Sequence, residues 1–343
     1  MKHVFLFSAL CLCAVSCGGD KVKLSGAGAT FPAPFYNIVC KAYSQASGNE
    51  VSYGGIGSGG GIRSLADKTV DFGGTDVFLS DEEMAALGAD VIHIPTALGA
   101  VVLAYNLKEV NELRLTPELI SAIYRGEIRQ WDDPRIQAAN PGIAFPGKTI
   151  TPVYRSDGSG TTAVFSEYMS KTNPAWEEAI GQGKSLPFPT GVAAKGNPGV
   201  AGVIAGTEGS IGYIGSEYAL ALNIPSAALL NREGRFVKAA NQSISASARA
   251  DVPPDTRTSI TDSPEPEAYP ISTFTWIIVY REQSYNKRTE ATAKALAALL
   301  SYIISDEGQE IAAKTYYAPL PQTVREAAAA QVGSLTFGGK ELR

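Results

Sequence analysis

Histidine and cysteine are scarce in this 343-residue chain, which contains two His and four Cys. Once an N-terminal export signal is removed and the cysteine after it is modified, only His93 and Cys40 remain. One imidazole and one thiol cannot build a His-rich metal site, a thiolate site or an internal disulfide. Cys40 lies in an apolar pattern with helical spacing, which indicates a core residue. These counts remove much metal and thiol chemistry. Together with the argument below, they lead us to expect no metal, no cofactor and no catalytic residues.

Basic clusters and long apolar runs are also missing. The formal net charge is −5 and Lys and Arg form no run, so nucleic acid and anionic lipid are poor candidate partners. No segment after the N-terminus reaches the roughly 18 unbroken apolar residues of a transmembrane helix. An acidic protein can still bind an anion where local dipoles form the site.

The N-terminus has the pattern of an export signal. A short basic start is followed by an apolar run at residues 4–15, which is too short to cross a bilayer. The run ends in Ala-Val-Ser-Cys, and small residues before Cys17 resemble the lipobox of bacterial lipoproteins. We predict that residues 1–16 are a signal peptide, removed by cleavage before Cys17, and that Cys17 anchors the protein by lipid in the periplasm or on the cell surface. The alternative is an ordinary signal peptide cut near Ser16.

Strand-like and helix-like apolar patterns alternate along the rest of the chain, which predicts an α/β fold with a mostly parallel sheet. The predicted strands are 22–25, 50–53, 70–73, 92–94, 99–105, 149–155, 211–214 and 274–280. The predicted helices are 32–47, one starting at 62, 81–87, 116–124, 161–170, 199–205 and 289–305. Residues 222–268 are polar and variable in pattern, and they support no prediction.

Three turns rich in Gly, Ser and Thr each join a predicted strand to a predicted helix, at residues 25–31, 55–61 and 155–162. A helix N-terminus presents free N–H groups and a partial positive charge. Glycine permits close approach of the backbone to a ligand, and hydroxyls add donors. The turns either converge on a small oxyanion or are three unrelated helix caps, and the pattern alone leaves both open.

Two literal motif matches are rejected on context. Residues 142–149 fit the P-loop pattern, but a strand follows where a P-loop requires a helix. Residues 55–60 fit the dinucleotide fingerprint, but the following helix is short and an exported protein meets few dinucleotides.

Seven ordered segments resemble the PstS family, the phosphate-binding proteins of bacterial ABC transporters. They are SGAGATFPAP (25–34), GIGSGG (55–60), VDFGGTD (70–76), GEIRQWDD (126–133), RSDGSGT (155–161), GSIGY (209–213) and YPIS (269–272). The resemblance implies a two-lobed periplasmic binding protein fold of type II, with the ligand in the cleft between the lobes. Lobe I would comprise 21–105 plus 276–343, and lobe II 106–275. The two crossover hinge strands would lie near 104–106 and 273–276.

By motif position, the resemblance places nine residues at the phosphate site. They are Thr30, Phe31 (by its backbone N–H), Ser58, Asp76, Arg155, Asp157, Ser159, Gly160 (by its backbone N–H) and Thr161. It further implies a monomer that is not an enzyme. Its partners would be inorganic phosphate, arsenate as an analogue, and the permease subunits of a phosphate ABC transporter.

The residue chemistry agrees with these roles. Arg155 is the charge-matched donor, and Asp157 two residues later can orient it; the alternative is a surface salt bridge. Asp76 beside an anion is useful only as an acceptor for a phosphate O–H; its alternative is a helix N-cap before residues 79–81.

Three other functions compete with phosphate binding. Sulfate and molybdate carry no proton for Asp76 at neutral pH. A secreted serine hydrolase would need a Gly-x-Ser-x-Gly elbow, which neither Ser58 nor Ser159 has, and His93 would be its only base. A secreted phosphatase would need clustered metal ligands, and the sequence offers no His-containing set.

Overall fold

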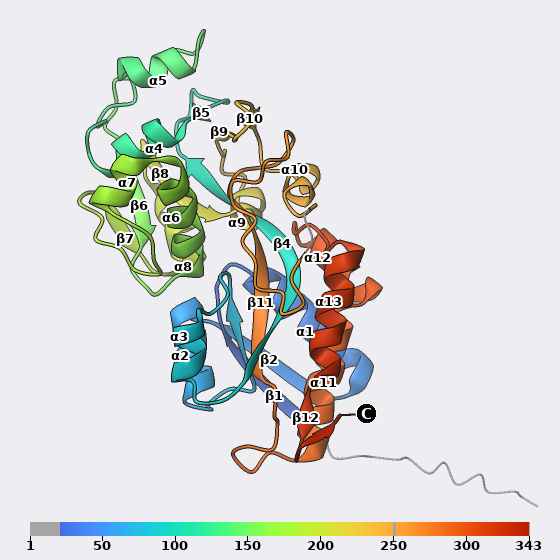
Figure 1. Ribbon diagram of the computed structural model, residues 1–343. Helices are drawn as coiled ribbons and strands as arrows, with labels where there is room; N and C mark the ends of the chain where they lie inside the picture. Colours follow the sequence, from blue (N-terminus) through green and yellow to red (C-terminus); the bar gives the residue numbers. More distant parts are fainter. Residues whose placement is uncertain (1–20, 250–251, 343) are drawn as a thin grey trace, which may run out of the picture.

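The protein has two lobes built on one strand that they share (Figure 1). The structure is a computed structural model that describes residues 21–249 and 252–342, so the predictions for residues 1–16 and Cys17 lie outside it. The strands are β1 (Lys23–Gly28), β2 (Glu50–Gly55), β3 (Phe72–Thr75), β4 (Val91–Tyr105), β5 (Arg114–Leu115), β6 (Thr151–Arg155), β7 (Val192–Ala194), β8 (Ser210–Gly215), β9 (Ala228–Leu230), β10 (Phe236–Val237), β11 (Ser272–Tyr280), β12 (Thr336–Phe337) and β13 (Lys340–Glu341).

Helices cover both lobes. They are α1 (Ala33–Ser47), α2 (Ser58–Ala66), α3 (Asp81–Ala86), α4 (Pro117–Tyr124), α5 (Pro134–Ala139), α6 (Gly160–Thr172), α7 (Pro174–Ala179), α8 (Gly196–Gly206), α9 (Ser216–Ala221), α10 (Asn241–Ala246), α11 (Glu290–Ile304), α12 (Asp306–Lys314) and α13 (Gln322–Gly333). In one lobe α2 packs on β1 and β3 while α13 packs on β4, and in the other α8 packs on β6 and β8.

The main sheet runs in the order β2-β1-β3-β11-β4-β8-β6-β7. Residues 91–100 of β4 pair with β11, and residues 101–105 pair with β8, so the strand changes partners between Ala100 and Val101. The outer strands on each side are parallel to one another, whereas β4 and β11 run antiparallel to their neighbours. The predicted α/β class is confirmed, and one continuous sheet supports both lobes.

The prediction of two strands at 92–94 and 99–105 is wrong, because β4 is one strand whose fifteen residues are all buried. Pro95 and Gly99 favour a break in the sequence pattern. The structure instead absorbs the irregularity as a bulge: Pro95 pairs with Trp276 and Ala97 with Thr275, which leaves Thr96 as an extra residue. The hydroxyl of Thr96 donates to the Thr275 carbonyl at 3.1 Å.

The helix predicted to start at residue 62 begins four residues earlier, at Ser58. Its first turn therefore contains three glycines, which helix propensity disfavours. Packing explains Gly61, because a Cβ there would lie 2.5 Å from the Gly28 Cα and 2.6 Å from the Ala27 carbonyl oxygen. Gly61 therefore lets α2 lie directly against β1.

Several local predictions are confirmed. Thr116 caps α4 with Pro117 in its first turn. Cys40 is buried in α1, and burial raises its thiol pKa to about 12. Residues 142–149 form a loop that leads into β6 rather than a helix, as expected for a chance P-loop match. Among the described residues, no helix is long and apolar enough to cross a membrane.

Residues 222–268 contain β9, β10, α10 and a loop that contacts the expected lobe I. The Thr256 hydroxyl donates to the His93 carbonyl at 2.7 Å, and the Trp276 indole donates to the Thr256 carbonyl at 3.2 Å. Arg257 forms an ion pair with Asp81 at 2.7 Å. This segment, which belongs to the expected lobe II, therefore contacts lobe I through His93, Trp276 and Asp81.

Candidate functional site

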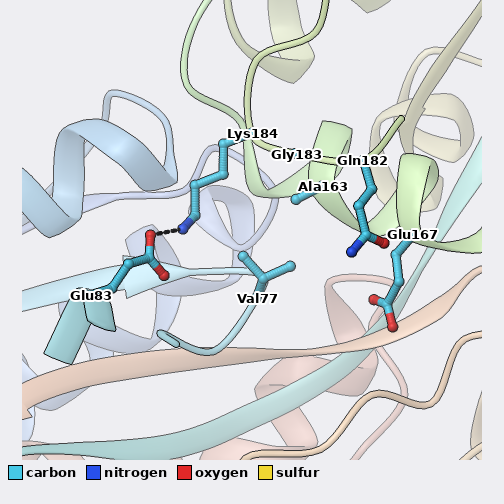
Figure 2. A pocket seen from close by; sticks show the side chains of 7 residues that line it. All are labelled: Val77, Glu83, Ala163, Glu167, Gln182, Gly183 and Lys184. Atoms are coloured by element: carbon cyan, nitrogen blue, oxygen red, sulfur yellow. Dashed lines mark hydrogen bonds and ion pairs between the residues drawn. The ribbon is translucent and has the colours of Figure 1, made fainter. Parts of the chain in front are cut away.

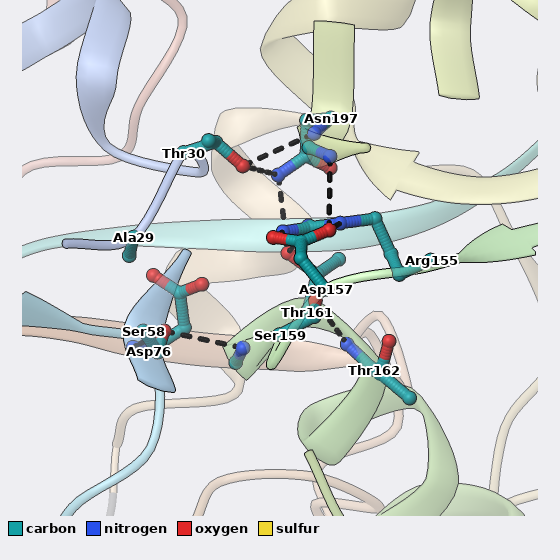
Figure 3. A network of polar contacts seen from close by, with 12 residues as sticks. Ala29, Thr30, Ser58, Asp76, Arg155, Asp157, Ser159, Thr161, Thr162 and Asn197 are labelled. Atoms are coloured by element: carbon teal, nitrogen blue, oxygen red, sulfur yellow. Dashed lines mark hydrogen bonds and ion pairs between the residues drawn. The ribbon is translucent and has the colours of Figure 1, made fainter. Parts of the chain in front are cut away.

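Four helix N-termini meet where the two lobes face each other. Helices α1, α2, α6 and α8 each follow a strand, β1, β2, β6 and β7 respectively. The polar side chains of Figure 3 come from the turns before these helices, from their first turns and, for Asp76, from the residue after β3. The three predicted glycine-rich turns are brought together with a fourth that was not predicted. A shared location for several N-termini concentrates N–H donors and partial positive charge in one place.

The turns before α2 and α6 touch each other through backbone. The Gly59 N–H donates to the Gly158 carbonyl at 3.0 Å, and the Gly160 N–H donates to the Ser58 hydroxyl oxygen at 3.1 Å. A Cβ on Gly160 would lie 2.4 Å from that hydroxyl oxygen and 2.8 Å from the Asp76 side chain. Position 160 therefore requires glycine, and the role of its N–H toward phosphate stays a prediction.

Arg155, the last residue of β6, is held by Asp157. Its Nε donates to Oδ1 at 2.8 Å and its second terminal nitrogen to Oδ2 at 2.6 Å, while the remaining terminal nitrogen reaches the Thr161 hydroxyl at 3.3 Å. The side chains are 1% and 13% exposed, so the surface salt-bridge alternative is wrong. Burial alone would raise the pKa of Asp157, but hydrogen bonds from Arg155 and Gly196 hold it below its usual range.

Asp76 lies directly after β3 and is 1% exposed. Its Oδ1 accepts a hydrogen bond from the Thr275 hydroxyl at 3.1 Å. Burial raises the pKa of Asp76 to about 7, against hydrogen bonds from Thr275 and Thr161 and the charge of Arg155, which lower it. Ser80 caps α3 instead, in a capping box with Glu83, so the N-cap alternative for Asp76 is wrong.

The predicted hydroxyls are all buried around these charges. The Ser58 oxygen accepts from the Gly160 and Asp76 N–H groups, at 3.1 and 3.4 Å. Ser159 caps α6 by accepting from the Thr162 N–H at 3.0 Å. Phe31 packs its ring against Tyr317 at 6.0 Å between centroids, which fixes the backbone at the start of α1.

Asn197, in the first turn of α8, was missed by the sequence analysis. It is fully buried and donates to the Thr30 hydroxyl from both its backbone nitrogen and its side-chain nitrogen, each at 3.0 Å. The side-chain nitrogen also reaches the Thr161 hydroxyl at 3.1 Å. The available signal was a fourth glycine-containing turn, Lys-Gly-Asn-Pro-Gly at 195–199.

A cavity of about 410 Å³ lies beside the site (Figure 2). It is lined by Val77, which follows Asp76, by Ala163 of α6, and by Glu83 and Lys184, which form an ion pair. The Lys184 carbonyl accepts from the Ser159 N–H at 2.9 Å. The ion pair therefore joins α3 to the loop that supports the α6 cap.

A hydrolase would need His93 as its base or a cluster of metal ligands. His93 is buried and its Nε2 accepts from the Leu79 N–H at 3.0 Å, while burial lowers its pKa to about 4. Residues 21–249 and 252–342 hold no group of three or more His, Cys, Asp or Glu that could bind a metal. The site instead offers buried donors and one carboxylate of raised pKa, which suits noncovalent binding of a protonated oxyanion.

Comparisons with known proteins agree with this geometry. A family model described as a PBP superfamily domain matches residues 16–307. The phosphate-binding protein PstS of Xylella fastidiosa (strain 9a5c) is 39% identical over 306 residues, covering 88% of this chain and 82% of that protein. The PstS of Methanocaldococcus jannaschii is 34% identical over 305 residues, covering 82% and 78%.

Solved structures show the same fold at lower identity. The phosphate-binding protein from Stenotrophomonas maltophilia superposes with a TM-score of 0.72 at 18% identity, covering 90% of this chain and 94% of that one. A phosphate ABC transporter substrate-binding protein from Clostridium perfringens, solved with bound phosphate, gives 0.65 at 20% identity, covering 87% and 100%. The chain therefore belongs to the PBP superfamily and, within it, to the PstS family of phosphate-binding proteins.

Proposed function

We propose that this protein binds inorganic phosphate outside the cytoplasm and hands it to the permease of an ABC importer, without catalysing a reaction. The observation that carries the proposal is that a buried cation, Arg155, and a buried acid of raised pKa, Asp76, share one cluster of hydroxyl and N–H donors. Donors hold the oxyanion and its charge, while the carboxylate accepts the proton that phosphate retains near neutral pH. The relatives named PstS support the same function.

The nine predicted site residues keep their proposed roles with one refinement. Nε and one hydrogen of a terminal nitrogen of Arg155 are committed to Asp157, and the other terminal nitrogen also donates to Thr161, so one hydrogen on each terminal nitrogen is left for the ligand. Asp157 therefore acts by fixing Arg155 rather than by meeting an anion directly. Its negative charge would otherwise oppose binding.

Titration calorimetry of the phosphate-free protein tests the function. Phosphate and arsenate should bind, since both are tetrahedral and carry a proton. Sulfate should bind roughly 10⁴-fold more weakly, because a buried polar group is left unpaired against it. Sulfate binding as tight as phosphate binding would overturn the assignment, and steady release of a chromophore from a phosphate ester would overturn the non-enzymatic role.

Asp76→Asn should change both selectivity and stability. Its amide offers sulfate a donor in place of a repelling charge, so the phosphate-to-sulfate affinity ratio should fall by at least about tenfold. The raised pKa of Asp76 means that its stabilising contribution is complete below about pH 4 and is lost as the pH rises through about 7. The phosphate-free variant should therefore gain on the order of 2–4 kcal/mol over wild type at pH 8 and almost nothing at pH 4.

Glu217→Gln is the matched control for Asp76→Asn. Glu217 is also a buried acid whose pKa burial raises, but it is not one of the nine site residues. It should also gain stability at pH 8, while the affinity ratio should change much less than in Asp76→Asn, because Glu217 acts on Asp76 only through its charge. An unchanged ratio in Asp76→Asn would show that discrimination arises elsewhere.

The lipid anchor is proposed for Cys17, which follows the signal-like run directly. Cys17→Ala should yield protein that carries no fatty acid and appears in the soluble fraction of the producing cells. Metabolic labelling with a fatty acid and fractionation measure both. Label retained at wild-type level in the variant would contradict the anchor.

Ligand-linked closure is proposed between lobe I (21–105 plus 276–343) and lobe II (106–275). The contacts between them include Asn197 to Thr30 and the Tyr218 hydroxyl to the Thr30 carbonyl at 2.6 Å. A ligand that touches both lobes favours the closed form. Small-angle scattering should show a smaller radius of gyration in phosphate than without it, and an equal radius at saturation would contradict closure.

A further inference from the structure

The side chain of Asn197 is fixed at both ends, so the direction of its amide is settled by its partners (Figure 3). Its Oδ1 accepts from the Gly215 N–H at 3.0 Å, at the end of β8. A flipped amide would set two donors against each other there. The Nδ2 group must therefore face the site, where its two hydrogens go to Thr30 and Thr161.

These contacts exhaust the acceptor capacity of both hydroxyls. A hydroxyl oxygen has two acceptor positions and one hydrogen to donate. Thr30 Oγ1 accepts twice from Asn197, from its backbone and side-chain nitrogens, each at 3.0 Å. Thr161 Oγ1 accepts from Asn197 at 3.1 Å and from Arg155 at 3.3 Å. Each hydroxyl can then act only as a donor toward anything else.

We infer that Asn197 is a positioning residue that sets the polarity of the anion site, by turning the Thr30 and Thr161 hydroxyls into obligatory donors. The inference rests on the proposed function, since it assumes that both hydroxyls meet the phosphate. Asn197 itself need not touch the ligand. Hydroxyls that can only donate form hydrogen bonds with unprotonated phosphate oxygens, and they disfavour an oxygen that carries a hydrogen.

This polarity complements Asp76, which is the acceptor of the site. A phosphate with one proton can place it on Asp76 and present bare oxygens to Thr30 and Thr161, and the Thr161 hydrogen then turns from Asp76 to the phosphate. A second proton on the phosphate would point at the Thr30 or Thr161 hydroxyl, which is itself a donor, so no hydrogen bond would form there. Asn197 therefore favours dibasic over monobasic phosphate, a preference that Asp76 alone does not create.

Asn197 also links this polarity to lobe closure. Thr30 precedes α1 in lobe I, whereas Asn197 and Thr161 lie in α8 and α6 of lobe II. The Thr30 hydroxyl is thus held as a donor only while the lobes are together. Loss of the contact should accelerate phosphate release more than it slows capture, because affinity differences between variants of one site arise mostly in the dissociation rate.

Asn197→Asp tests the inference, because it keeps the shape of the side chain and replaces both donor hydrogens by acceptor positions. The two hydroxyls can then donate to the introduced carboxylate instead of to phosphate. We expect phosphate affinity to fall about a hundredfold at pH 8.5, because the charge-assisted hydrogen bonds from Thr30 and Thr161 to phosphate are lost. The loss should be smaller at pH 5.5, where phosphate brings a second proton and the introduced carboxyl can itself be protonated.

Asn140→Asp is the matched control. Asn140 is equally buried in lobe II, with Oδ1 accepting from the Arg114 N–H at 2.7 Å and Nδ2 donating to two carbonyls. It should lower the melting temperature but leave phosphate affinity and its pH dependence as in wild type. Such a result would show that burying a carboxylate lowers stability without changing phosphate affinity, so the loss of affinity in Asn197→Asp would come from the altered hydrogen-bond polarity of the site.

Asn197→Ala covers the case in which Asn197→Asp does not fold. It frees one acceptor position on each hydroxyl, so affinity should fall about tenfold, with the larger part of the change in the dissociation rate. Wild-type protein that fails to bind phosphate would overturn the proposed function itself. The positioning role alone would be overturned if the wild-type protein binds phosphate and a folded Asn197 variant binds it with an affinity within about threefold of wild type at pH 8.5.

Discussion

The buried pair of Arg155 and Asp157 is the interaction on which the rest of the site depends. A guanidinium with an almost fully buried side chain needs a partner, because an unpaired charge in that position would cost several kcal/mol. Asp157 supplies the partner and accepts in addition from the Gly196 N–H at 3.0 Å. That bond places the start of α8, and with it Asn197. The Arg155–Asp157 ion pair therefore positions both the Arg155 guanidinium and the N-terminus of α8.

The site is built at the expense of stability. Asp76 sits in a place where burial disfavours its charged form. Poorly solvated groups of this kind are typical of binding sites and are tolerated where the surrounding fold is well packed. Here the support is a strand, β4, that is buried along its whole length and continues from one lobe into the other.

The division of labour between donors and acceptor explains how an acidic protein can bind an anion. The net charge of −5 is not concentrated at the site, where helix N-termini and hydroxyls surround an arginine paired with Asp157 and one further acid, Asp76. Selectivity then follows from which oxygen of the ligand keeps a hydrogen. A proton-bearing oxyanion matches one acceptor among many donors, and a fully ionised one does not.

Local sequence patterns determined the α/β class, the capped helix at Thr116 and Pro117, and the three turns that carry the predicted site residues, since caps and glycine turns are encoded by neighbouring residues. The motif resemblance supplied the prediction that those three turns bind one phosphate together. Tertiary structure alone decided that Pro95 and Gly99 lie within one strand, because the bulge depends on the facing strand. It also decided the raised pKa of Asp76 and the role of Asn197. Burial and cross-lobe hydrogen bonds are properties of segments distant in sequence, and no local pattern records them.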